Sequence, residues 1–151
     1  MSINASQFRE YIVRAPLQLV KLWSADAEEL LMMTAAQESH LGEFLRQVGS
    51  GPALGIYQME PATHADCWRY ITQKHVPNLP WAWQQTGDTL IWNLQYATVM
   101  CRIKYLEIPT AIPAATNIDG LAWYWKHWYN SDLGSGTAQE AIENYHRYVK
   151  P

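Results

Sequence analysis

Apolar side chains recur along the first half of this chain with the period of an α-helix. The pattern predicts a helix over residues 27–39, "AEELLMMTAAQES", with Ser24 or Asp26 as its N-cap. The segment 3–23 is also helical in pattern. Because proline removes a backbone donor, we expect Pro16 to break that segment into two short helices.

Further helices are predicted in the second half of the chain. Pro61 suits the first turn of a helix over "PATHADCWRYITQKH", Asn117 can start "IDGLAWYWKHWY", and Thr137 with Glu140 forms a capping box for a last helix. On that last helix Ala141, Tyr145 and Tyr148 share a face. A long helix is expected over residues 89–108 and should be buried, because one face of it carries Leu90, Leu94, Ala97, Cys101 and Tyr105.

The helical period fails between Gly42 and Gln58. There "GSGP" has the composition of a turn, and "ALGIYQ" fits a short strand or an extended loop. A second irregular segment, "VPNLPWAWQQTG", contains prolines and is closed by Thr86 or Asp88 as a cap. Since no shift in composition marks a boundary, we expect residues 1–151 to form a single, mainly α domain with a small irregular or β insert after the helix of residues 27–39.

Composition excludes several classes of protein. The 151 residues are 48% hydrophobic and carry a net charge of −3, which argues against disorder and against a nucleic-acid partner. No segment predicts a signal peptide or membrane insertion. The two cysteines and five histidines have no metal-ligand spacing, so we expect buried, reduced thiols, no metal and no cofactor.

Eight tryptophans and nine tyrosines are the unusual feature of the composition. Large aromatic side chains pack in cores and also stack against ligands. In the cluster "WYWKHWY", the spacing places Trp125 and Trp128 close to the apolar face of the predicted helix, whereas Trp123 faces away.

Candidate chemistry centres on Glu38. Leu31, Ala35 and Glu38 follow an i, i+4, i+7 series, so the carboxyl continues an apolar stripe. Partial desolvation there would raise its pKa, as a general acid near neutral pH requires. Gln58 interrupts an apolar segment and could orient a sugar N-acetyl group or hydroxyl beside Glu38. The alternatives are a helix-end glutamate that turns to solvent and a glutamine on the exposed face of a short strand.

Three ordered motifs resemble those of soluble lytic transglycosylases and goose-type lysozymes. They are Glu38-Ser39, then "GIYQMEP" over residues 55–61, then Tyr129-Asn130, with a helical segment that includes Asn93 between the last two. The resemblance runs from about Ala25 to Val149 and is nearest to short, single-domain transglycosylase-like proteins of tailed phages. It implies a lysozyme-like fold.

The resemblance also implies a role for each matched residue. Glu38 would be the acid and base, Ser39 and Gln58 would line the −1 side of the cleft, and Tyr129 and Asn130 would contact substrate or hold Glu38. The chain departs from the family at three positions: Glu60 replaces an apolar residue, Trp128 replaces an alanine, and the glycine that follows the third motif, Gly134, comes late.

The implied substrate is the glycan strand of peptidoglycan, cut at the β-1,4 bond between N-acetylmuramic acid and N-acetylglucosamine. A hydrolytic muramidase commonly uses a second carboxylate, for which Glu43, Glu60 and Asp66 are candidates. A lytic transglycosylase needs only one, and because no partner of Glu38 stands out, we favour that activity. The rival interpretation is a non-catalytic virion protein with other phage virion proteins as partners. As an enzyme, the protein would be made in the host cytoplasm and act on the cell wall in the periplasm, after release as an endolysin or as a virion component.

Overall fold

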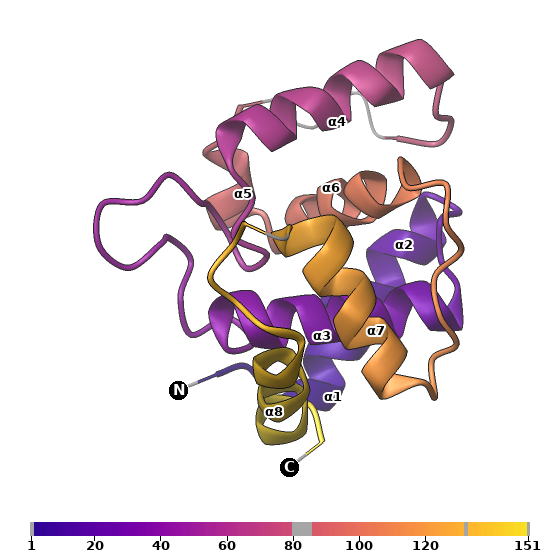
Figure 1. Cartoon of the computed structure of the whole chain (residues 1–151). Coiled ribbons are helices and arrows are strands. Elements are labelled where there is room, and N and C mark those ends of the chain that lie inside the picture. Colours follow the sequence, from indigo (N-terminus) through magenta and orange to yellow (C-terminus); the bar gives the residue numbers. More distant parts are fainter. Residues whose placement is uncertain (1, 80–85, 132, 151) are drawn as a thin grey trace.

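The computed structural model describes residues 2–79, 86–131 and 133–150, and in these ranges the chain is mainly helical (Figure 1), which confirms the predicted fold class. The helical segments, two of them π-helices written η, are α1 (Ala5–Gln7), η1 (Phe8–Arg14), α2 (Ala15–Leu19), α3 (Ala25–Ser39), α4 (Pro61–Lys74), α5 (Thr89–Trp92), α6 (Leu94–Leu106), α7 (Ile118–Trp125), η2 (Lys126–Asn130) and α8 (Ala138–Tyr148).

The helix α3 lies at the centre of this arrangement. The Ser24 hydroxyl accepts a hydrogen bond from the Ala27 N–H at 3.0 Å, which confirms Ser24 as its N-cap. The helix contacts η1, α6, α7 and α8. Most of its side chains are therefore buried, rather than one stripe alone, and it lies among the other helices in Figure 1. Its fully buried apolar residues include Leu30, Leu31, Met32 and Met33.

The predicted break at Pro16 is wrong, because α1, η1 and α2 follow one another without interruption. The Ala15 N–H donates to the Glu10 carbonyl, a π-helical hydrogen bond. In that register the proline leaves the Tyr11 carbonyl without its backbone donor, and the Gln95 side chain donates to this carbonyl at 3.1 Å. The wider turn and the substitute donor together accommodate the proline.

The predicted long helix over residues 89–108 is interrupted at Asn93. This residue is extended, and its side chain accepts a hydrogen bond from the Tyr96 N–H at 3.0 Å, so it caps α6. Asparagine is among the best N-cap residues, and here its capping preference prevails over a continuous apolar pattern. The expected face is nevertheless largely buried, with Leu90, Ala97, Cys101 and Tyr105 in the core.

The C-terminal helices begin as predicted. The Asn117 side chain accepts from the Gly120 N–H at 2.9 Å, and Thr137 with Glu140 forms the complete capping box of α8. Trp125 is fully buried, Trp128 is partly buried, and Trp123 is 67% exposed, as their spacing indicated.

The insert between α3 and α4 is irregular. Its only β features in the described part of the chain are two isolated bridges, which pair Leu54 with Arg46 and with Met59. The loop extends well beyond the helices in Figure 1. The second irregular segment falls partly on residues 80–85, which lie outside the described ranges. Among the described helices, none is long and apolar enough to cross a membrane.

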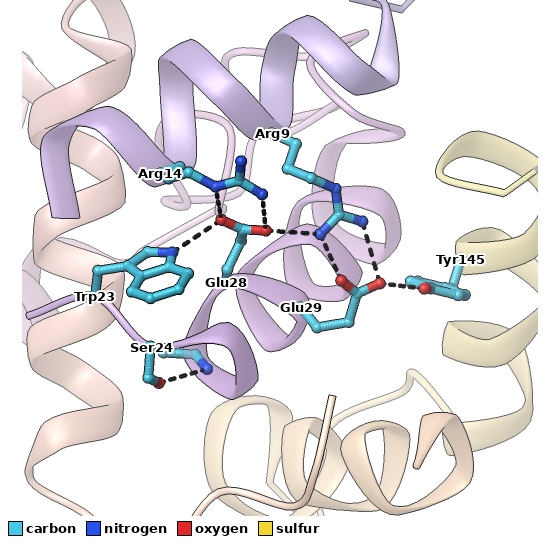
Figure 2. A network of polar contacts seen from close by, with 8 residues as sticks. Arg9, Arg14, Trp23, Ser24, Glu28, Glu29 and Tyr145 are labelled. Carbon is cyan, nitrogen blue, oxygen red and sulfur yellow. Dashed lines mark hydrogen bonds and ion pairs between the residues drawn. The ribbon is translucent and has the colours of Figure 1, made fainter. Parts of the chain in front are cut away.

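Two buried carboxylates anchor the N-terminal end of α3 (Figure 2). Arg9 donates to Glu28 at 3.1 Å and also to Glu29, while the Arg14 Nε donates to the other oxygen of Glu28 at 2.6 Å. Glu29 in turn accepts a hydrogen bond from the Tyr145 hydroxyl of α8. This network joins the N-terminal helices, α3 and α8.

The network makes a prediction about stability. Arg9→Met should lower the free energy of unfolding at neutral pH by about 3 kcal/mol, because it leaves buried carboxylates short of a partner. Burial alone would raise the pKa of Glu28, but hydrogen bonds from Arg14, Trp23 and Arg9 together hold it below its usual value. That stabilisation is present at neutral pH and is lost as the pH falls through the folded pKa.

Urea unfolding at several pH values measures this effect. The difference in the free energy of unfolding between Arg9→Met and the wild type should become smaller in acid. The control variant Lys74→Met, at an exposed position, should have nearly the stability of the wild type. An Arg9→Met protein as stable as the wild type at neutral pH would contradict the assigned role of the network.

Candidate active site

The C-terminal end of α3 opens into a cleft of about 710 Å³ that Glu38 lines. The insert forms one wall, and the N-terminal end of α4 and Lys104 of α6 contribute to another. The cleft is completed by Tyr129, Asn130, Ser131, Gly134 and Ser135. Gln58 and Glu60 also line this cleft. Four of the five residues matched by the resemblance, Glu38, Gln58, Tyr129 and Asn130, therefore line one cleft, although the segments that carry them are far apart in the sequence.

Backbone geometry fixes the place of Glu38. The helix ends one residue later, and His40 and Leu41 then adopt left-handed conformations, with φ of 51° and 58°, followed by Gly42 at 87°. This reversal turns the chain into the insert and leaves Glu38 in the last helical turn, partly buried at the rim of the core.

Two effects act in opposite directions on the Glu38 carboxyl. Burial disfavours its charged form and raises its pKa to about 7, while a hydrogen bond from Trp125 limits the rise. In that bond the indole Nε1–H donates to Oε1 at 3.0 Å. In the described part of the chain no Lys, Arg or His forms an ion pair with Glu38. The carboxyl therefore exchanges its proton near neutral pH.

Gln58 stands on a tight turn that packs against α5. It has a φ of 47°, and its side-chain amide donates to the Gly55 carbonyl at 2.8 Å. Gly55 itself has a φ of 79°, and a Cβ there would lie 2.2 Å from the Leu90 carbonyl oxygen, so no other residue fits. Although the segment is not extended as the sequence suggested, Gln58 and Glu60 still line the same cleft.

Tyr129 supports the opposite wall rather than Glu38. Its hydroxyl donates to the Tyr57 carbonyl at 2.6 Å, and the Tyr57 hydroxyl bonds to Thr98 of α6 at 2.8 Å. The residue preceding Gln58 is thus held from both sides. The resemblance allowed Tyr129 either to contact substrate or to hold Glu38. The side chain that bonds to Glu38 is Trp125 instead.

Asn130 is held in place at the end of η2. Its amide oxygen accepts a hydrogen bond from Lys126 Nζ at 2.7 Å, and the same ammonium donates to the Gly134 carbonyl at 2.9 Å. A Cβ on Gly134 would lie 2.3 Å from the Asn130 amide oxygen. The late glycine therefore allows the chain to pass close over Asn130.

The prediction that Ser39 lines the cleft is wrong. Its side chain is fully buried and is not part of the cleft surface. The hydroxyl donates to the Ala35 carbonyl at 3.2 Å and accepts from the Gly42 N–H at 3.0 Å. Ser39 therefore terminates α3 and fixes the reversal that follows, which affects the cleft only through Glu38.

The three candidate second carboxylates have different surroundings. Glu60 is exposed, precedes α4 as its N-cap residue without capping it through its side chain, and lines the cleft. Glu43 pairs with His40 at 3.3 Å, and Asp66 pairs with Arg69. Neither Glu43 nor Asp66 lines the cleft, so Glu60 is the one carboxylate of the three that shares it with Glu38.

Two residues of the site were missed from the sequence. Trp125 was expected in the core, which is correct, but its bond to Glu38 was not foreseen. A buried indole usually needs an acceptor for its N–H, and that requirement is the signal that could have linked Trp125 to a nearby carboxyl. The helix that carries Lys104 was predicted from its apolar face, and nothing in the sequence indicated that Lys104 lines the cleft.

The described residues include no group of three or more His, Cys, Asp or Glu side chains that could hold a metal ion. Cys67 and Cys101 are buried free thiols, and burial raises their pKa values. Comparisons with protein-family models, curated proteins and solved structures find no match for this chain.

The raised pKa of Glu38 predicts a pH-dependent cost in stability. Between the ordinary value of 4.5 and about 7, the folded state binds the proton more tightly than the unfolded state, so stability falls as the pH rises through this window. Glu38→Gln removes the ionisation while keeping an oxygen that can accept from Trp125. At pH 8 it should therefore be more stable than the wild type by about 3 kcal/mol, and at pH 4.5 by much less.

Thermal and urea unfolding across this pH range measure the difference. Glu143→Gln, at an exposed position of α8, controls for the loss of a carboxylate. A Glu38→Gln protein whose stability tracks the wild type at every pH would show that the Glu38 carboxyl is not desolvated.

Proposed function

We propose that this protein cleaves the β-1,4 bond between N-acetylmuramic acid and N-acetylglucosamine in peptidoglycan, as a lytic transglycosylase with Glu38 as its single acid and base. The observation that carries the proposal is a desolvated carboxyl with a pKa of about 7 that opens into the cleft. A general acid works best when its pKa lies near the operating pH. The cleft volume also falls within the range of about 300–1,000 Å³ for ligand sites.

The reaction then needs no second protein carboxylate. In the first step the Glu38 proton passes to the leaving glycosidic oxygen as the C1–O bond breaks, and the acetamido oxygen of the muramic acid bonds to C1. In the second step the 6-hydroxyl oxygen attacks C1 and the bond to the acetamido oxygen breaks. The hydroxyl proton returns to Glu38, which restores the acid and releases a 1,6-anhydro end.

The other residues of the cleft would bind and orient the sugars. Gln58 already donates to Gly55 and Asn130 already accepts from Lys126, but an amide has two N–H donors and an oxygen with two lone pairs, so each keeps capacity to bond to acetamido and hydroxyl groups. Tyr129 already donates its hydroxyl to Tyr57, so its contribution is the ring and the shape of the wall. Peptidoglycan strands would be the partner, reached by an endolysin after release or by a virion component during entry.

One observation favours a second candidate function. Because Glu60 lines the cleft with Glu38, a hydrolytic muramidase could use it to activate water or as a nucleophile. The non-catalytic virion protein is less well supported, since assembly alone gives no reason to keep a desolvated carboxyl with a pKa near neutrality in a cleft.

Side-chain replacements separate these functions. Glu38→Gln should reduce the release of soluble fragments from purified peptidoglycan by at least about 100-fold, because an amide cannot donate the proton to the leaving oxygen. Glu60→Gln should keep most of the activity, because the proposed mechanism gives Glu60 no chemical step. Asp66→Asn, at a carboxylate outside the cleft, is the matched control.

The outcomes differ between the candidates. A folded Glu60→Gln protein that loses activity as severely as Glu38→Gln would establish the muramidase instead. A wild-type protein that binds peptidoglycan but releases no fragments would favour the virion protein. Circular dichroism on each variant excludes loss of the fold as the cause.

A further inference from the structure

We propose that Trp125 is a positioning residue for the Glu38 carboxyl: its indole N–H holds Oε1 as an acceptor and leaves Oε2 as the oxygen that exchanges the proton in the cleft. The catalytic part of this inference rests on the proposed function, whereas the contact between the two side chains is observed in the structure. The Nε1–Oε1 distance is 3.0 Å, and the bond joins α7 to α3.

The indole is held rigidly enough to act in this way. Trp125 is fully buried. Gly136, in the segment that leads into α8, lies so close to the ring that a Cβ there would be 2.8 Å from Trp125 Cη2. On the other side, Gln37, which precedes Glu38, accepts a hydrogen bond from Asn144 of α8 at 2.7 Å. Contacts with α8 and with the segment that precedes it therefore hold the indole and the helical turn that carries Glu38.

The bond acts differently on the two forms of Glu38. A hydrogen bond from N–H is stronger to a carboxylate than to a neutral carboxyl. It is therefore strongest after Glu38 has given its proton to the leaving oxygen and before the 6-hydroxyl returns one. An interaction that strengthens along the reaction raises kcat rather than lowering KM.

The other ionisable groups around Glu38 do not replace this role. Cys101 and Tyr105 of α6 and Tyr129 of η2 interact with it, and burial holds the pKa of each well above its ordinary value, so they stay neutral near pH 7. The titratable side chains nearest the cleft include Lys104 and Glu60, which line it, Lys126, which bonds to Asn130, and His40, which pairs with Glu43. The surrounding helices also carry Arg102, Asp119, His127, Glu140, Glu143, His146 and Arg147. The replacement of Trp125 leaves all of these side chains in the protein.

The experiment compares Trp125→Phe with Trp123→Phe, a matched change at an exposed position of the same helix. The readouts are the Glu38 carboxyl-carbon NMR titration, assigned by its absence in Glu38→Gln, and the pH dependence of kcat and KM for fragment release. Without the N–H donor, the Glu38 midpoint should rise by about one pH unit. The alkaline limb of kcat/KM should move with it, and kcat should fall with little change in KM. Trp123→Phe should alter none of these.

A Trp125→Phe protein that is folded and has an unchanged Glu38 midpoint would overturn the proposal. If this variant does not fold, an NMR titration of the wild type tests the same proposal. Its Trp125 indole N–H resonance should titrate with the Glu38 midpoint, near pH 7, and should not titrate in Glu38→Gln. An indole N–H resonance whose chemical shift does not change as Glu38 titrates would overturn the proposal.

The failure of the proposed function gives a different pattern. If the wild type cleaves no glycan but the Glu38 and Trp125 resonances titrate together, the positioning contact stands and the assignment as a transglycosylase fails. If cleavage occurs and the resonances are independent, the function stands and the role of Trp125 fails.

Discussion

The helix α3 is packed against other helices along its whole length, so every polar side chain that it carries inward must find a partner or remain desolvated. Its two ends meet this constraint in opposite ways. At the N-terminal end Glu28 receives hydrogen bonds from two guanidinium groups and an indole, which hold its pKa below the usual value against the effect of burial. At the C-terminal end Glu38 receives one indole N–H, and burial prevails to raise its pKa to about 7. The first carboxylate stabilises the fold, whereas the second is available for proton transfer.

The cleft depends on contacts between segments that are distant in sequence. Tyr57 is held through its hydroxyl by Thr98 and through its carbonyl by Tyr129, so the turn that carries Gln58 is fixed to α6 and η2 at once. Lys126 bonds to both Asn130 and the Gly134 carbonyl, and thereby fixes the third wall. Groups that are held in place before a ligand arrives lose less conformational entropy on binding, which under the proposed function would favour orientation of the glycan beside Glu38.

Local patterns predicted much of this structure, because helix caps and apolar periodicity depend on neighbours in the sequence. Ser24, Asn117 and the capping box of Thr137 with Glu140 are examples, as is the buried position of Trp125. The failures have two kinds of cause: a partner from a distant part of the chain, or a local hydrogen bond that prevails over the expected pattern. Pro16 is accommodated because Gln95 supplies a donor from another helix. Ser39 is buried because its hydroxyl bonds to the Ala35 carbonyl and to the Gly42 N–H, and Asn93 interrupts the expected long helix because it caps α6. The cleft placement of Glu38 followed from its helical stripe, but its bond to Trp125 depends on how α3 and α7 cross.

We propose that Glu38 completes the cleavage reaction without a water molecule activated by the protein. Digestion of purified peptidoglycan in water labelled with a heavy oxygen isotope tests it directly, with the fragments identified by mass spectrometry. We expect 1,6-anhydro ends that contain no label, because the oxygen that closes the ring comes from the sugar's own 6-hydroxyl. Reducing ends that carry one labelled oxygen for each bond cut would contradict it and would show that the enzyme is a hydrolase.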